Sequence, residues 1–339
     1  MISEQTRPRA DAGLDEARQV LDRIRARVRH QVIGRDAVID LVLIALVADG
    51  HVLLEDFPGS GKTTLAKALG GAIRAEGTGL ASFRRIQFTP DLLPSDVTGI
   101  SVFDPKTGEF DFRQGPVFTH VLLADEINRT SPKVQAALLE AMAEKQVTLD
   151  NVTHPLDELF FVVATQNPRD LAGTYPLPVA QLDRFLFKVR MDPIDRAAEL
   201  AVLRTRRERR DEDPDHLPAV DRSDVLRARA AIDAGIAVDE VIHECLVDVA
   251  EALRADERVA QAASTRSLVL SVPALQARAT LKGRDFVSSD DLEALLPYVL
   301  SHRIEAVATH GEEPHGLARE LMAAPLERLA RASLRGLGR

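Results

Sequence analysis

A buried strand that continues into a glycine-containing loop and then into a helix is the feature that most constrains this chain. Residues 51–54 are typical of a short buried strand, and residues 65–73 follow a helical pattern. The loop between them contains Pro58, Gly59, Ser60, Gly61, Lys62, Thr63 and Thr64. Backbone N–H groups of such a loop, at the amino end of a helix, bind anions, so the segment predicts a phosphate site.

Lys62 and Thr63 indicate that the phosphate belongs to a nucleotide. Lys62 supplies a positive charge for the β- and γ-phosphates of a nucleotide, and the hydroxyl of Thr63 is placed to bind Mg²⁺. The strict pattern for this loop begins with glycine, where this chain has Asp56. Because aspartate tolerates left-handed backbone angles better than most residues, we expect the turn to form. The loop therefore predicts nucleotide binding with Mg²⁺.

Short apolar strands alternate with helical segments along the first half of the chain. Buried strands are expected again at 83–88, 121–124 and 159–165, and a helix at 131–144. This order predicts an α/β fold with a parallel sheet that helices cover on both faces.

Two β-hairpins are also expected, at 98–117 and at 147–154. The alternating aromatic residues Phe103, Phe110 and Phe112 in the first hairpin either pack the hairpin itself or grip a substrate chain.

A change of composition near Met191 suggests a domain boundary, because Ala, Leu and Arg dominate beyond it. We expect a disordered tail at 1–13, a nucleotide-binding domain at 14–192 with a hairpin insert near 100–115, and a helical domain at 193–339.

Composition excludes several classes of protein. The 339 residues are 45% hydrophobic and 28% charged, which is typical of packed globular domains. The net charge of −9 argues against nucleic acid as a partner. The single cysteine, Cys245, rules out an intrachain disulfide framework. No apolar run reaches the length of a membrane helix and no secretory signal is visible, so we expect a cytoplasmic protein without membrane insertion.

Two adjacent carboxylates follow the strand at 121–124. Because ligands bind at the carboxyl ends of parallel strands, Asp125 and Glu126 are expected near the phosphate loop. Asp125 would hold Mg²⁺ through water, and Glu126 could activate the attacking water. Asn167, which follows the next buried strand, could orient that water against the γ-phosphate.

Two arginines could complete such a site. Arg184, in the segment Leu182–Phe185, has the side chain that stabilises charge on a transferring phosphoryl group. In a ring it would reach the γ-phosphate of a neighbouring subunit. Arg266, at a predicted helix start, could close the helical domain onto bound nucleotide. Arg129 is a weaker second candidate for an intersubunit contact.

The order of these motifs resembles that of MoxR-type AAA+ ATPases over roughly residues 14–310. The segments that carry the resemblance are 31–34, 58–64, 85–99, 123–129, 132–142, 164–168, 173–178, 181–185 and 302–303.

The resemblance implies an αβα nucleotide domain with a C-terminal helical lid, ATP and Mg²⁺ as cofactors, and a role for each site residue. It implies a Walker A loop at 58–64, a Walker B pair at Asp125 and Glu126, sensor 1 at Asn167, an arginine finger at Arg184 and sensor 2 at Arg266. Val32, Ile33 and Gly34 would line the adenine pocket. Thr265 and Val179 depart from the family pattern, where Pro and Glu are common.

The implied function is that of an ATP-hydrolysing ring, expected to be a hexamer, that acts as a remodelling chaperone. Its partner would be a protein with a von Willebrand factor A domain. Three alternatives stay open on these residues: a magnesium-chelatase-type ATPase subunit, a nucleic-acid motor, and a binding module in which nucleotide is only a switch. The negative charge argues against the motor, and the Asp125–Glu126 pair argues against the switch.

Overall fold

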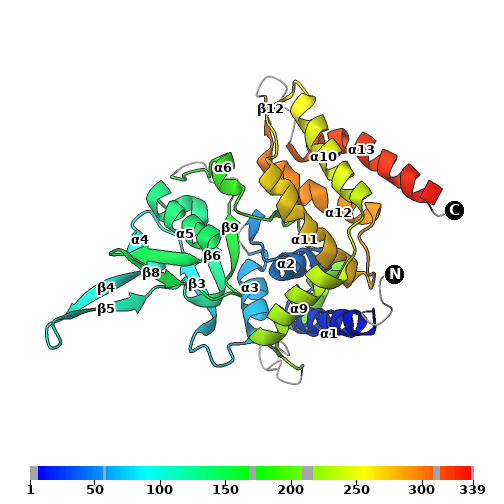
Figure 1. Cartoon of the computed structure of the whole chain (residues 1–339). Coiled ribbons are helices and arrows are strands. Elements are labelled where there is room, and N and C mark those ends of the chain that lie inside the picture. Colours follow the sequence, from blue (N-terminus) through cyan, green and yellow to red (C-terminus); the bar gives the residue numbers. More distant parts are fainter. Residues whose placement is uncertain (1–6, 56–58, 168–172, 208–216, 308–313, 337–339) are drawn as a thin grey trace.

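A five-stranded parallel sheet forms the centre of the molecule (Figure 1). The structure is a computed structural model, and it describes residues 7–55, 59–167, 173–207, 217–307 and 314–336. The strands stand in the order β10 (Phe187–Arg190), β1 (Val52–Glu55), β9 (Phe161–Gln166), β6 (Thr119–Asp125) and β3 (Ala81–Gln87). All neighbouring strands in this sheet are parallel, as expected, and β10 is a fifth strand that the sequence pattern did not reveal.

Both faces of the sheet are buried, which explains why its strands are apolar without interruption. Leu54, Val121 and Val163 belong to one hydrophobic cluster, while Leu53, Leu122 and Val162 belong to the other. Successive side chains of a strand point to opposite faces, so a strand covered on both sides needs apolar residues at every position.

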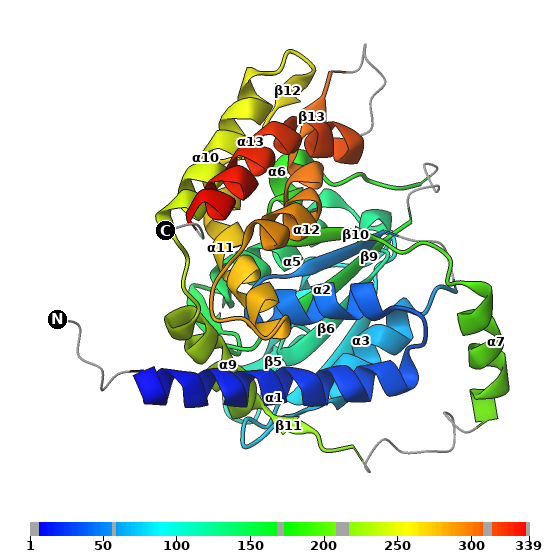
Figure 2. The same cartoon turned by 90° about the vertical axis from the view of Figure 1, so that its right-hand side faces the viewer.

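Helices supply the covering layers, and the long N-terminal helix runs beside the sheet (Figure 2). Within the nucleotide domain they are α1 (Arg7–Gln31), α2 (Asp36–Val47), α3 (Lys62–Gly71), α4 (Pro94–Thr98), η1 (Ile127–Arg129), α5 (Pro132–Glu144) and α6 (Val179–Leu182). Beyond residue 192 they are α7 (Arg196–Arg204), α9 (Arg222–Gly235), α10 (Glu240–Ala255), α11 (Thr265–Leu281), α12 (Ser289–Leu300), η3 (Ser301–Arg303) and α13 (Pro314–Gly336). Among the helices that the structure describes, none combines the length and apolar character needed to cross a membrane.

Two of the segments expected from the sequence need correction. The expectation of a disordered tail at 1–13 is wrong from Arg7 onward, because α1 begins there, and residues 1–6 lie outside the described residues. The segment 193–339 is not all-helical. It contains β11 (Val220–Asp221), which pairs with β2 (Ile73–Arg74), and the antiparallel pair of β12 (Val259–Gln261) and β13 (Glu305–Ala306).

The boundary at 192–193 does not separate two hydrophobic cores. One cluster contains Leu21 of α1, Leu43 of α2, Val225 of α9 and Leu275 of α11. Helix α9 therefore packs as part of the first domain, although it follows the expected boundary in the chain. Its position depends on contacts between segments far apart in sequence, which local composition does not report.

The hairpin of β4 (Gly99–Asp104) and β5 (Glu109–Gln114) projects from the body of the molecule (Figure 1). At its outer part the rings of Phe103 and Phe110 lie 5.3 Å apart and remain 50% and 72% exposed. At its base Phe112 stacks at 3.8 Å on His154 of the second hairpin, formed by β7 (Gln146–Leu149) and β8 (Val152–Pro155). The aromatic residues thus do pack the hairpins, and two of them still present apolar surface.

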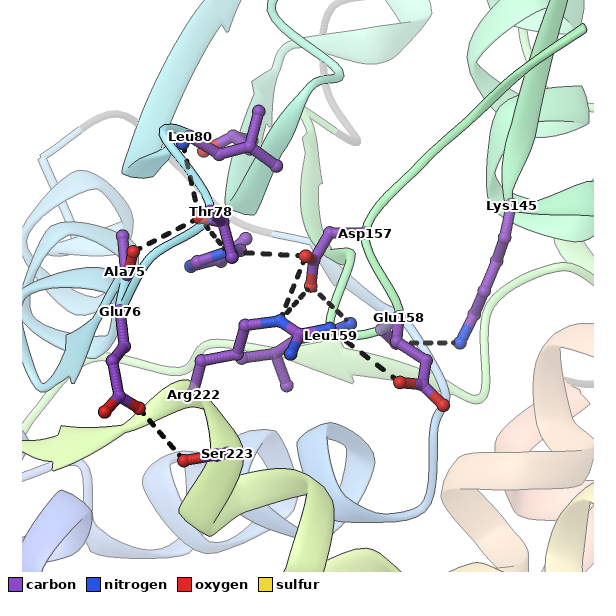
Figure 3. A network of polar contacts seen from close by, with 12 residues as sticks. Ala75, Glu76, Thr78, Leu80, Lys145, Asp157, Glu158, Leu159, Arg222 and Ser223 are labelled. Carbon is purple, nitrogen blue, oxygen red and sulfur yellow. Dashed lines mark hydrogen bonds and ion pairs between the residues drawn. The ribbon is translucent and has the colours of Figure 1, made fainter.

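A polar network joins the start of α9 to the amino-terminal edge of the sheet (Figure 3). Arg222 Nε donates to both carboxylate oxygens of Asp157, at 2.8 and 3.0 Å, and the backbone N–H of Leu159 donates to Asp157 Oδ1 at 2.8 Å. Burial alone would raise the pKa of Asp157, but the hydrogen bonds from His120, Arg222 and Leu159 outweigh it and hold that pKa well below its usual range.

This network makes stability depend on pH in the acid range. Because the pKa of Asp157 is depressed in the folded state, its contribution is present above the unfolded value of about 4 and is lost as the pH falls below it. We expect Asp157→Asn to lower the free energy of unfolding by about 2 kcal/mol at pH 7. The difference from the wild type should shrink progressively in urea titrations as the pH falls below about 4. An equal difference at all pH values would contradict this account of the network.

Candidate nucleotide-binding site

A cavity of about 390 Å³ opens at the carboxyl ends of β1, β6 and β3. The phosphate loop forms one side of this cavity, with Gly59, Ser60, Gly61, Lys62, Thr63 and Thr64. Arg85, Gln87, Asp125 and Glu126 line the other side. The structure thus brings together the glycine-containing loop and the acidic pair that the sequence placed 63 residues apart, counted from Lys62 to Asp125.

The glycines of the loop are required by their backbone angles. Gly59 has φ = +90° and Gly61 has φ = +95°, a region that other residues rarely adopt. No described atom beyond their immediate chain neighbours lies within 4 Å of a Cβ built on either, so the space next to both is open. Gly61 immediately precedes α3, so the amino end of this helix, whose first N–H groups have no acceptor within the helix itself, faces the cavity. Pro58 and Asp56 lie outside the described residues.

The two carboxylates are held in different ways. Asp125 is the last residue of β6, and Thr165 Oγ1 of β9 donates to its Oδ1 at 2.6 Å. The same hydroxyl accepts the backbone N–H of Glu126 at 2.9 Å. Thr165 is fully buried, so one fixed hydroxyl sets the position of both acidic residues.

Glu126 has a strained backbone and a shared carboxylate. Its angles, φ = 58° and ψ = 48°, are left-handed, which is costly for a glutamate and is found in strained residues that cluster at functional sites. Gln87 Nε2 donates to Glu126 Oε2 at 2.9 Å, and Arg129 Nε lies 3.1 Å from the same oxygen. Arg129, expected as an intersubunit contact, thus pairs with Glu126 of its own chain.

The residues fit an Mg²⁺ ion that accompanies nucleotide phosphates. Mg²⁺ prefers oxygen ligands and is usually held by one or two protein groups together with phosphates and water, and the Asp125 carboxylate and the Thr63 hydroxyl supply such groups in one cavity. Arg85 Nη2 now donates to Asp125 Oδ2 at 2.7 Å. Because the Arg85 side chain is 45% exposed, it can leave that oxygen without repacking the core.

Residues 32–34 lie beside the phosphate loop. Arg35, the next residue, donates to the carbonyl oxygen of Ser60 at 3.4 Å and to that of Asp192. Gly34 has φ = +72°, and a Cβ built on it would come within 2.5 Å of Ala198 Cβ in α7. Val32 is buried, whereas Ile33 is only partly so. This arrangement is compatible with Val32, Ile33 and Gly34 next to a bound base.

Asn167 follows β9, the strand between β1 and β6, and its position is therefore between the phosphate loop and the acidic pair along the sheet edge. Its backbone oxygen accepts a hydrogen bond from Asn128 Nδ2 at 3.4 Å. The residues that follow it, 168–172, lie outside the described part of the chain.

The two arginines expected at separate places lie in one neighbourhood. Arg184 follows Asp183, whose carboxylate accepts hydrogen bonds from Arg303 Nε at 2.6 Å and from Ser267 Oγ at 3.2 Å. Ser267 is the residue after Arg266, and the positive charge of Arg266 acts on Arg303. Neither Arg184 nor Arg266 is among the described residues that line the cavity. A role of Arg266 in closing the helical domain onto bound nucleotide stays a prediction.

Sequence reasoning gave no role to Thr165, Arg85 or Gln87, which contact the carboxylates of Asp125 and Glu126 or hold the backbone there. Arg85 and Gln87 lie on β3, whose residue Gln87 stands opposite Asp125 in the sheet. The sequence does contain a signal for them, because they are polar residues near the ends of strands predicted to be buried, as Asn167 is. This signal identifies neighbours of Asp125 only when the order of the strands in the sheet is known.

Comparisons with known proteins find matches over the part of the chain that contains this site. The family model described as ATPase family associated with various cellular activities (AAA) matches residues 51–187, and an AAA lid domain model matches residues 251–322. The uncharacterized protein YeaC of Bacillus subtilis is 43% identical over 89% of this chain and 94% of its own length. The chaperone MoxR1 of Mycobacterium tuberculosis is 36% identical over 88% of this chain and 78% of its own.

Two further relatives extend the comparison. The protein MoxR of Methylorubrum extorquens is 32% identical over 87% of this chain and 90% of its own length. A crystal structure of a candidate ATPase from Cytophaga hutchinsonii superposes with a TM-score of 0.83 at 34% identity, over 93% of this chain and 97% of that one. Both the sequence and the fold are thus shared over nearly the whole length.

Proposed function

The chain belongs to the MoxR family of AAA+ ATPases, and on that premise we propose that it hydrolyses ATP to ADP and phosphate with Mg²⁺. The observation that carries the proposal is the single cavity that holds Lys62, Thr63, Asp125 and Glu126 together. ATP supplies the phosphoryl group, and Mg²⁺ neutralises charge on its phosphates. The alternatives of a chelatase-type subunit, a nucleic-acid motor or a nucleotide switch have no specific observation in their favour.

Each residue of the cavity has a defined task in this proposal. Lys62 and the N–H groups at the start of α3 bind the phosphates, and Thr63 and Asp125 hold the metal ion. Glu126 accepts a proton from the attacking water, once Gln87 and Arg129 release enough of its carboxylate. Asn167 orients that water, and Val32, Ile33 and Gly34 contact the base.

We further propose that the active form is a ring, with six subunits as the expected number. Within one chain the cavity contains Arg85, which is bound to Asp125, whereas Arg184 and Arg266 are not among the described residues that line it. In a ring, a subunit contributes Arg184 to the nucleotide of its neighbour, and Arg266 closes the helical domain onto bound nucleotide. Arg184 then stabilises the charge that develops on the transferring phosphoryl group.

The ring proposal predicts that ATP turnover per subunit depends on protein concentration. Turnover should rise at least about tenfold as subunits assemble, because a site without its neighbour lacks the arginine. Steady-state phosphate release measured across a dilution series, with sedimentation velocity on the same samples, checks this. Constant turnover per subunit down to full dissociation would show a self-sufficient site and contradict the proposal.

As a remodelling chaperone in the cytoplasm, the ring would act with a protein that contains a von Willebrand factor A domain. This part of the proposal is supported by the name chaperone given to the M. tuberculosis relative and by the exposed aromatic hairpin of β4 and β5. Affinity capture from native lysate with the Glu126→Gln variant, in ATP and in ADP, tests it. Recovery of chelatase subunits or nucleic acid in place of such a partner would favour the corresponding alternative.

A further inference from the structure

We propose that Arg303, with His302, is a positioning residue for Arg184, so that the helical lid holds the arginine finger in place. The inference rests on the proposed function, because it requires Arg184 to act on the nucleotide of a neighbouring subunit. It concerns the finger segment, defined here as Asp183–Leu186, between α6 and β10.

Arg303 surrounds the finger segment with hydrogen bonds. Its Nη2 donates to the carbonyl oxygen of Asp183 at 3.1 Å and to that of Phe185 at 2.8 Å. Its Nη1 donates to the carbonyl oxygen of Leu186 at 3.2 Å, and its Nε donates to the Asp183 carboxylate at 2.6 Å. One guanidinium therefore fixes the residues on both sides of Arg184.

His302 adds a second contact to the same segment. Its Nε2 lies 3.0 Å from the carbonyl oxygen of Phe185, to which it donates in the tautomer that carries the proton there. Burial first, and then the neighbouring charge of Arg303, lower the pKa of His302 well below its usual value, so the ring is neutral at pH 7.

The environment makes this arrangement rigid. Arg303 is 2% exposed and His302 5% exposed, and Phe185, Leu186 and Phe187 are buried next to them. A guanidinium buried to this extent needs its donors satisfied, and the finger segment satisfies them together with the carbonyl oxygen of Val299 in α12. The Arg184 side chain, by contrast, is only partly buried. A fixed backbone thus carries a side chain with access to solvent, as an arginine that must reach a neighbouring subunit requires.

The contacts come from the lid and end on the nucleotide domain. Arg303 and His302 belong to η3, directly after α12, and Ser267 of α11 donates to the same Asp183 carboxylate at 3.2 Å. A movement of the lid would therefore move the finger segment with it.

The variant that tests the proposal is Arg303→Lys. Lysine keeps the positive charge and can still pair with Asp183, but a single ammonium cannot donate to the carbonyl oxygens of Asp183, Phe185 and Leu186 at once. We expect kcat to fall at least about tenfold, because a small displacement of a catalytic group strongly lowers the reaction rate. The ATP dissociation constant should stay within about twofold, since the phosphate loop is not touched.

Mixed rings separate a positioning role from general damage. A subunit with Arg303→Lys keeps its phosphate loop, and a subunit with Glu126→Gln keeps its finger. The two inactive variants are mixed in equal amounts and reassembled. In a head-to-tail ring, about one quarter of the sites then combine Glu126 of one subunit with an intact finger segment of its neighbour. Turnover should then exceed the sum of the separate variants several-fold. Damage that spreads to the phosphate loop of the same chain gives no such recovery.

The matched control is Arg278→Lys. Arg278 also forms an ion pair in the lid, with the fully buried Asp291, which lies outside the finger segment. We expect turnover within about twofold of the wild type and a similar loss of thermal stability. If Arg303→Lys does not assemble, Asp183→Asn provides a second test, because it removes only the charge that Arg303 faces.

Six outcomes are decisive. Absence of ATP turnover in the wild type overturns the proposed hydrolysis, and wild-type turnover in Arg184→Ala overturns the role of Arg184 as the arginine finger. Either result overturns this inference as well. If Arg184→Ala alone is inactive but regains turnover when it is mixed with Glu126→Gln subunits, the ring proposal is supported. Wild-type turnover in Arg303→Lys, or a loss that mixing does not restore, then overturns the positioning role alone. An equal loss in Arg278→Lys also overturns it.

Discussion

Glu126→Gln is expected to bind ATP as tightly as the wild type and to hydrolyse it about 10²- to 10³-fold more slowly, because a glutamine cannot accept the proton of the attacking water. The substitution keeps the shape of the side chain, and the backbone N–H of residue 126 can still donate to Thr165. Binding of a fluorescent ATP analogue and single-turnover hydrolysis measure the two quantities separately.

Glu16→Gln is a suitable control for this experiment, because Glu16 is an exposed carboxylate on α1 outside the cavity. It should behave as the wild type in both assays. Turnover in Glu126→Gln within about threefold of the wild type would remove Glu126 from the role of general base. Another group of the cavity would then have to accept the proton of the attacking water.

Lys62→Ala is expected to weaken ATP binding at least about 100-fold, which corresponds to about 2.7 kcal/mol. The lysine lies at the start of α3 and lines the cavity, where its charge would act on phosphates together with the helix N–H groups. Without this charge the remaining N–H groups bind the phosphates less tightly. Isothermal titration with ATP and with ADP, in the presence of Mg²⁺, measures the loss.

Lys67→Ala provides the matched control on the same helix. Lys67 is exposed and is not among the described residues that line the cavity. Its removal should change ATP affinity less than about twofold, because surface charges at that distance are screened by salt. Retention of micromolar affinity in Lys62→Ala, or an equal loss in Lys67→Ala, would contradict the assignment of the phosphate loop.

Two features were predicted well from the sequence because they depend on neighbouring residues. The loop around Gly59 and Gly61 joins a strand to a helix within a few positions, so its backbone angles and its direction follow from local chain geometry. The same holds for Asp125, which ends a strand buried on both faces. Parallel strands then bring the two segments to one edge, which makes the cavity a consequence of fold class.

The fifth strand and the helical segments beyond residue 192 were harder to predict. Strand β10 is only four residues long and follows the finger segment without a turn signal. Strand β11 pairs with β2 over two residues, across about half the chain, and α9 then packs on α1. Such pairings depend on which apolar faces meet, and a single sequence does not specify that.

By itself, the sequence determined the phosphate loop, the acidic pair and the parallel sheet that joins them, since each is set by residues a few positions apart. Only the tertiary structure decided where Arg266 lies and which residues hold the carboxylates. It also revealed the pairing of Arg303 with Asp183, which are 120 residues apart. The physical reason is that a buried guanidinium is stable only where several oxygens converge, and those oxygens come together only when the chain has folded.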